Sequence, residues 1–338
     1  MIVDLRSDTF TKPTAGMMKA MQTAPVGDDV FEEDTSVNQL EKMAAEMFGM
    51  EAALYCPTGT MSNQIAIKVH TQPGDEVICE RSSHVYQYEG GGIAFNAGCQ
   101  VNLIDGDRGK ITAAQVESSI NADDVHKAVS RLVSLENTAN RGGGSCYEFE
   151  EIKRIKQSCL KNNLQLHLDG ARLFNAIVAR NETPKQYGEQ FDSISVCLNK
   201  GMGCPIGSVL ISNKTVIKKA RRIRKVFGGG MRQAGFMAAT GIYALENHID
   251  RLKEDHKNAR IVGEAISKKP FCPKLLPVET NIIIFETRSP QDCKHLIETF
   301  KKNNILAIAM SPIQIRFVFH LDITDEMVAH VLKTIESL

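Results

Sequence analysis

The feature that most constrains the fold is the alternation of short apolar runs with amphipathic stretches along most of the chain. Helical spacing of apolar residues follows Ser36, a predicted N-cap, and stops at Gly49. The apolar runs predict seven strands, over residues 52–56, 76–79, 100–104, 131–135, 164–168, 194–198 and 208–211. Such alternation favours an α/β domain, in which a mixed, mostly parallel seven-stranded sheet is covered by helices.

The C-terminal quarter of the chain has a different pattern. Helical spacing over residues 233–268 leads into a segment with predicted strands and helices of its own. The strands are predicted at 281–286, 305–309 and 314–319, and the helices at 291–303 and 325–338. We therefore expect a large domain over residues 1–250 and a smaller α+β domain over residues 251–338.

Composition excludes several classes of protein. Forty basic residues balance forty acidic ones, so no global field favours nucleic acid or an anionic membrane. Nine cysteines are scattered without a CxxC pair or metal-ligand spacing, which predicts reduced thiols, no metal site and a cytoplasmic location. The basic run 214–225 carries an apolar stripe at helical spacing, which favours a helix with a solvated basic face over a nucleic-acid arm.

Lys200 is the first residue that suggests chemistry. It follows an apolar run and precedes the glycine-rich turn GMGCPIG, so its flanks are predicted to be buried and tightly turned. Burial disfavours the ammonium form, and a neutral lysine amine can form a Schiff base with an aldehyde. A lysine whose head reaches water at a strand end remains the alternative.

Asp169 ends another apolar strand, one strand–helix unit before Lys200, so the two side chains can face one pocket. Pyridoxal phosphate (PLP) needs this pair: an amine for its aldehyde and a carboxylate that keeps its pyridine nitrogen protonated. Taken alone, Asp169 could instead be a helix N-cap.

Two further segments could complete such a site. The loop CPTGTMSNQ opens a helix, and Gly59, Thr60 and the amides after them could cradle a phosphate, although an ordinary capped helix start fits as well. His84 follows the strand at 76–79, where an imidazole could stack on a planar cofactor or move protons. A histidine that is merely hydrogen-bonded within the structure is the alternative.

Together these segments resemble the low-specificity L-threonine aldolases, PLP enzymes of fold type I. The resemblance runs from DLRSDTFTKPT and VGDDVFEED through PTGTMSNQ, SSHVYQYEGGG, SLENTANRGGG, HLDGARLFNA, CLNKGMGCPIGS and FGGGMRQAG to IQIRFVFHLD. These motifs appear in the family's order and cover nearly the whole chain. The resemblance implies retro-aldol cleavage of threonine-like β-hydroxy amino acids to glycine and an aldehyde.

The resemblance also implies a role for each matching residue. Lys200 would be the catalytic Schiff-base lysine, Asp169 the partner of the pyridine nitrogen and His84 the ring-stacking residue. The phosphate would be bound by Gly59 and Thr60 and by Arg232 of a neighbouring subunit. Holding the substrate would fall to Ser7, His126, Arg172 and Arg316, with Arg172 also near the cofactor and His126 near the substrate hydroxyl. The proton acceptor stays open between His84, His126 and a phosphate-bound water.

Some features depart from the family, and two rival functions remain. Asn199 stands where serine is common, Ala139 where histidine is frequent, and Phe31 and Glu32 where Tyr-Gly is usual. The rivals are a PLP-dependent β-eliminating lyase and a catalytically silent PLP-binding protein. The resemblance further implies a contribution of the N-terminal segment to the active site, a small amino-acid substrate as partner, and a tetramer of paired dimers of this chain that share active sites.

Overall fold

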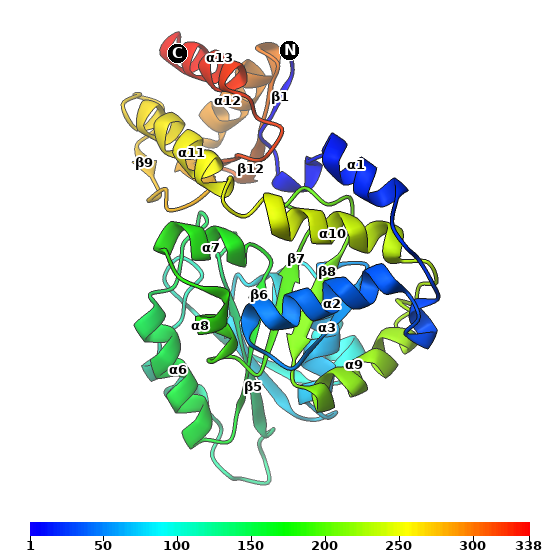
Figure 1. Cartoon of the computed structure of the whole chain (residues 1–338). Coiled ribbons are helices and arrows are strands. Elements are labelled where there is room, and N and C mark those ends of the chain that lie inside the picture. Colours follow the sequence, from blue (N-terminus) through cyan, green and yellow to red (C-terminus); the bar gives the residue numbers. More distant parts are fainter.

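The computed structural model describes residues 1–338 and consists of a large lower and a small upper part (Figure 1). A seven-stranded sheet lies at the centre of the large part, in the order β2-β8-β7-β6-β5-β3-β4. All neighbouring pairs are parallel except those that involve β8. The strands are β2 (Ala52–Cys56), β3 (Glu76–Glu80), β4 (Gln100–Ile104), β5 (Ser130–Glu136), β6 (Gln165–Gly170), β7 (Ser193–Cys197) and β8 (Ser208–Ser212). The predicted mostly parallel seven-stranded sheet is therefore confirmed.

Helices cover both faces of this sheet because alternate side chains of a strand point to opposite faces. On β2, Ala53 and Tyr55 enter the main core, whereas Leu54 and Cys56 pack with the opposite helices. The helices are α2 (Thr35–Phe48), α3 (Gly59–His70), α4 (His84–Gln87), α5 (Ala113–Ser119), α6 (Phe149–Lys161), α7 (Leu173–Arg180), α8 (Pro184–Gly188) and α9 (Lys214–Val226). A single-turn π-helix, η3 (Ile93–Ala97), packs beside α3.

Two local predictions need correction. Asp34, not Ser36, caps α2, because its Oδ1 accepts the N–H of Val37 at 3.0 Å while Ser36 already lies inside the helix. The apolar stripe predicted in α9 consists of Val216, Ala220, Ile223 and Phe227; Ala220 is buried and Ile223 and Phe227 pack beside it, but the buried face also includes Ile217 and the charged Arg224. The guanidinium of Arg224 is tolerated there because its Nη2 lies 2.7 Å from Asp29 Oδ2.

The small part holds a second core and a four-stranded antiparallel sheet. Helix α10 (Gly235–Asn247) lies on α1 (Ala15–Gln22) and α2, and the chain then enters α11 (Leu252–Ser267). The remaining elements are β9 (Lys274–Leu275), β10 (Ile282–Glu286), α12 (Pro290–Lys302), β11 (Ile305–Leu306), β12 (Ile308–Ser311), β13 (Gln314–Val318) and α13 (Asp325–Glu336). The predicted strand at 305–309 is thus divided between two sheets.

The N-terminal residues belong to this second core, although residues 1–250 were predicted to form the large domain. Strand β1 (Val3–Asp4) pairs in parallel with β11, and Val3 and Leu5 are fully buried in the second core. Both chain ends accordingly lie in the small part (Figure 1). The chain then passes through the short helix η1 (Asp8–Phe10) towards the large part. No helix is long and apolar enough to cross a membrane.

Candidate active site

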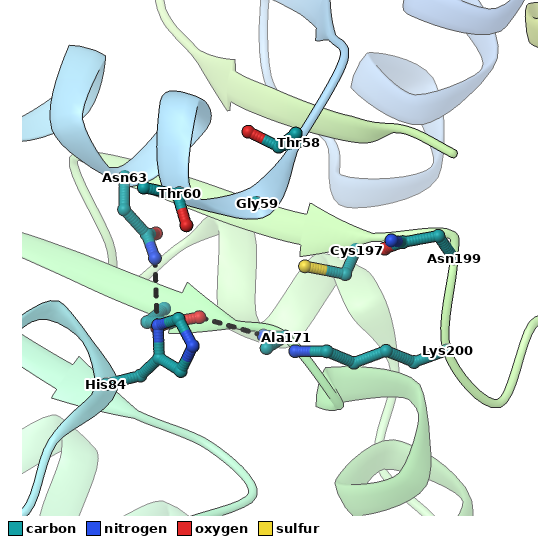
Figure 2. A pocket seen from close by; sticks show the side chains of 10 residues that line it. Thr58, Gly59, Thr60, Asn63, His84, Ala171, Cys197, Asn199 and Lys200 are labelled. Atoms are coloured by element: carbon teal, nitrogen blue, oxygen red, sulfur yellow. Dashed lines mark hydrogen bonds between the residues drawn. The ribbon is translucent and has the colours of Figure 1, made fainter. Parts of the chain in front are cut away.

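A polar cavity of about 160 Å³ opens where β6 and β7 end, at the carboxyl edge of the sheet. It brings together five of the residues predicted from the sequence (Figure 2). Its lining consists of Thr58, Gly59, Thr60, Asn63, His84, Asp169, Ala171, Cys197, Asn199 and Lys200. Residues from four separate segments therefore meet at one place, as the arrangement of a parallel sheet predicts.

Lys200 extends into the cavity from the turn that follows β7 (Figure 2). Its carbonyl oxygen accepts the N–H of Gly203 at 2.8 Å, which closes the turn. Gly203 has φ +82°, and a Cβ there would lie 2.9 Å from Leu321, so a glycine is required both by conformation and by space. The glycine-rich turn thus fixes the backbone from which the lysine side chain projects.

Asp169 lies on the neighbouring strand β6 and is buried. Its Oδ1 accepts the N–H of Ala171 at 3.1 Å, and its Oδ2 accepts Nδ2 of Asn63 at 3.0 Å. Helix α7 begins only at Leu173 with Arg172 at its N-cap position, so Asp169 is not a helix cap. The alternative explanation of this carboxylate is therefore wrong.

The start of α3 forms another wall of the cavity. Thr58 is the N-cap and accepts the N–H of Met61 at 3.1 Å, which leaves the N–H groups of Gly59 and Thr60 without intrahelical partners. A Cβ on Gly59 would lie 2.5 Å from Sγ of Cys197, so the helix approaches β7 as closely as a glycine allows. Free N–H groups at the positive end of a helix form a site for a phosphate.

His84 occupies the wall opposite Lys200, with its ring held by a buried carboxylate. Its Nδ1 lies 2.9 Å from Oε1 of Glu89, and its backbone N–H donates to Oε2 of Glu136 at 2.7 Å. Burial opposes the charged imidazolium, but the hydrogen bond to Glu89 and the charge of Asp169 raise the pKa of His84 above its usual value. Because Nδ1 faces Glu89, Nε2 is the ring atom left for proton transfer.

Two buried guanidinium groups lie beside the cavity with a single carboxylate between them. Arg172 donates through Nε and Nη2 to the two oxygens of Asp8, each at 2.7 Å. Arg316 donates to Oδ1 of Asn140 and to the carbonyl of Arg6, and its Nε is buried without a partner. Burial and the neighbouring Arg172 lower the pKa of Arg316 to about 10. The pair thus carries an uncompensated positive charge that a substrate carboxylate would neutralise.

Ser7 lies in the same N-terminal segment and is buried. Its Oγ accepts the N–H of Thr9 at 3.2 Å and the hydroxyl of Thr9 at 2.9 Å. The hydroxyl proton of Ser7 therefore remains available for an external acceptor.

His126 is not brought to this cavity. It lies in the loop before β5, and since β5 runs parallel to β6, this loop is at the opposite edge of the sheet from Asp169. The His126 side chain is 86% exposed, and its Nδ1 lies 2.7 Å from Oδ1 of Asp124. Within a single chain His126 therefore lies away from the cavity, and its contact with the substrate stays a prediction that only the site of another copy could meet.

Four buried residues of the site were missed as site residues: Asp8, Asn63, Glu89 and Glu136. All four stand inside motifs already noted, DLRSDT, PTGTMSNQ, SSHVYQYEGGG and SLENTANRGGG. The signal that could have identified Glu89 and Asp8 is a charged residue in the same short motif as a predicted site residue, His84 or Ser7, because a carboxylate buried with that residue requires a partner.

Comparison with known proteins supports the family that the sequence motifs resemble. A family model described as "Beta-eliminating lyase" matches residues 4–289. The low specificity L-threonine aldolase of Escherichia coli K12 is 42% identical over 331 residues, which is 98% of this chain and 97% of that protein. The chain belongs to the β-eliminating lyase family, and threonine aldolases are its relatives within it.

Other relatives and solved structures agree with this family. The low specificity L-threonine aldolase of Saccharomyces cerevisiae is 40% identical over 340 residues, which cover 99% of this chain and 86% of that protein. The structure of Leishmania major threonine aldolase superposes with a TM-score of 0.86 at 20% identity and covers 99% of each chain. The latter likeness shows the fold, which is that of fold type I.

The positions that depart from the threonine aldolase pattern leave the cavity intact. Asn199 lines it, so an amide is present where a hydroxyl is usual. Ala139 is buried next to the turn at Gly109, where a Cβ on that glycine would lie 2.6 Å from the alanine methyl. Glu32 adopts φ +62°, the left-handed conformation that a glycine would favour, and Phe31 is exposed.

Proposed function

We propose that this chain is a PLP-dependent lyase that cleaves L-threonine, L-allo-threonine and related β-hydroxy-α-amino acids to glycine and an aldehyde. One observation carries the proposal. The amine of Lys200, the carboxylate of Asp169 and the free N–H groups at the start of α3 line one cavity, in a chain that matches named threonine aldolases over almost its whole length. This set of donors fits the aldehyde, the pyridine nitrogen and the phosphate of PLP.

The cofactor would be held from several sides. Lys200 would bind its aldehyde carbon, Asp169 its ring nitrogen, and Gly59 and Thr60 its phosphate through their N–H groups. His84 would stack on its ring. When bound, PLP supplies an electron sink for the electron pair that remains at Cα when the Cα–Cβ bond breaks.

Substrate recognition would rest on the guanidinium pair and Ser7. The free Nε of Arg316 and the remaining N–H edge of Arg172 would bind the substrate carboxylate, with the Ser7 hydroxyl as a further donor. Fixing the carboxylate orients the Cα–Cβ bond for cleavage. We assign acceptance of the β-hydroxyl proton to Nε2 of His84, because Glu89 holds the ring from the other side as a carboxylate holds a catalytic histidine.

The remaining assignments concern a neighbouring subunit. Arg232 has a side chain that is 55% exposed and is bound only to Asp28, so it is free to reach the phosphate in another copy of this chain. His126, exposed at the far edge of the sheet, would act only in the site of another copy. We propose a tetramer of paired dimers in the cytoplasm; the nine unpaired, buried cysteines fit a reducing compartment.

The test is a visible spectrum of the purified protein before and after addition of L-allo-threonine, with aldehyde release followed by alcohol dehydrogenase and NADH. A visible band that shifts, together with aldehyde release, is expected. Lys200→Ala should abolish both, whereas Lys219→Ala, a change at an exposed lysine of α9, should retain both. Pyruvate and ammonia instead of aldehyde would indicate a β-eliminating lyase, and a band without turnover would indicate a silent binder. Retained cleavage in the Lys200→Ala variant would refute the assignment.

A further inference from the structure

A chain of hydrogen bonds leads from Asp169 away from the cavity into the interior. Asn63 donates through Nδ2 to Oδ2 of Asp169 at 3.0 Å, and its Oδ1 lies 3.2 Å from Nε2 of His167. On the other side of the ring, Nδ1 of His167 lies 2.9 Å from Oγ of Ser193, which lies 2.9 Å from Nε2 of His70. These residues come from α3, β6 and β7, so the chain of contacts crosses from the sheet to the helix that covers it. We name it the Asp169 relay.

The charge states of the two histidines determine the direction of each bond. Burial lowers the pKa of both His70 and His167 to about 4, so each ring is neutral near pH 7 and carries one N–H. Nδ2 of Asn63 contacts carboxylate oxygens of both Asp169 and Glu89, which fixes the orientation of the amide. Its carbonyl oxygen therefore faces His167, whose Nε2 must be the donor.

The remaining directions follow from this tautomer. With the proton on Nε2, Nδ1 of His167 accepts the hydroxyl of Ser193, and the oxygen of Ser193 accepts the N–H of His70. The carbonyl oxygen of Ser193 also lies 3.2 Å from Nδ1 of His167, but the hydroxyl of Ser193 is closer, at 2.9 Å. The other tautomer would satisfy only this side of the ring, because it would set a lone pair of Nε2 against the carbonyl oxygen of Asn63. Every donor in the relay consequently points towards Asp169, and hydrogen bonds aligned in this way polarise one another in a buried site.

The pocket brings several buried acidic residues close together, and the relay acts on one of them. Asp169 shares the site with two other buried acidic residues, Glu89 and Glu136. Burial and the charge of Asp169 raise the pKa of Glu136, which shows how closely these carboxyl groups interact. A donor held firmly against Asp169 fixes the position of the carboxylate that would face the cofactor nitrogen.

We propose that His167 and Ser193 are positioning residues, which act through Asn63 to hold Asp169 as an oriented carboxylate towards the cofactor nitrogen. This inference rests on the proposed function, because the cofactor nitrogen is that of PLP. His167 and Ser193 are fully buried and do not line the cavity, so neither would touch cofactor or substrate.

The experiment uses the holoenzyme reconstituted with PLP that carries ¹⁵N in its ring. Ser193→Ala and His167→Leu should move the ring-nitrogen resonance towards that of unprotonated pyridine and weaken cofactor binding roughly tenfold, which is within the range expected for the loss of one hydrogen bond. The control is Ser134→Ala, a buried strand serine whose hydroxyl has no partner and whose strand register places it beside His167. This control should retain the wild-type resonance and affinity.

The outcomes distinguish a failure of the relay from a failure of the proposed function on which it rests. A wild-type protein without a visible band would overturn the proposed function and the relay with it. If the wild type shows the protonated ring nitrogen and Ser193→Ala matches Ser134→Ala in resonance and affinity, the relay alone is overturned. If His167→Leu does not fold, Ser193→Ala is the deciding variant, because it removes a single oxygen atom and disturbs the packing least. Loss of fold in both variants would show a purely structural role and would also overturn the proposal.

Discussion

The substitution Asp8→Asn tests the electrostatics of the site most directly. It keeps the shape of the side chain but removes the only carboxylate bound to the Arg172 guanidinium. Although burial alone would raise it, Arg172 lowers the pKa of Asp8 from its usual 3.8 to about 2, which corresponds to about 2.5 kcal/mol in favour of the charged form. Breaking a buried ion pair typically costs about 3–5 kcal/mol. We therefore expect Asp8→Asn to lower the free energy of unfolding by about 3 kcal/mol at pH 7.

The measurement is urea unfolding at one protein concentration with saturating cofactor, since both affect apparent stability. Asp4→Asn is the matched control, because its 2.6 Å ion pair with Arg6 has side chains 25% and 37% exposed and should contribute at most about 1 kcal/mol. The contribution of Asp8 is fully present above pH 3.8 and is lost as the pH falls through about 2, so the difference between wild type and Asp8→Asn should shrink in that range. Equal losses in the two variants would refute the account of Asp8 as a desolvated counter-charge.

Three further predictions concern the cavity. Glu89→Gln removes the charge that raises the pKa of His84, so the acidic limb of the pH profile of kcat/KM should move to lower pH; an unchanged limb would contradict this role. Gly59→Ala places a Cβ 2.5 Å from Sγ of Cys197 and should weaken cofactor binding roughly tenfold in a titration of the apoprotein, unless the helix can shift without loss. Arg316→Lys loses the planar fork and should raise KM for the amino acid roughly tenfold with an unchanged visible band; an unchanged KM would exclude Arg316 from carboxylate binding.

Elements that show a pattern within a few residues were predicted more accurately than elements that depend on a distant partner. Strands β2 and β4 have the predicted ends, and those of β3 and β5–β8 differ from the predicted ends by one or two residues, because an apolar run with a turn at each end is visible without its neighbours. The cap of α2 was misplaced by two residues, since Asp34 and Ser36 are both good capping residues and only the backbone conformation decides between them. Strand β1 was missed because its partner β11 lies about three hundred residues away.

The α/β architecture and the chemistry at the carboxyl edge of the sheet could be predicted from the amino-acid sequence. Asp169 lies near the end of a strand, Lys200, His84 and the loop at Gly59 each follow one, and parallel strands place such residues together whatever their separation along the chain.

The partners of the buried charged groups became visible only in the folded chain. The pairing of Asp8 with Arg172, the contact of Glu89 with Asn63 and the position of His126 at the edge of the sheet opposite Asp169 depend on packing between distant segments. The direction of the Asp169 relay likewise depends on which atoms meet in the interior. Local sequence carries no record of these contacts, because a buried charge needs only some partner, and the fold determines which one is within reach.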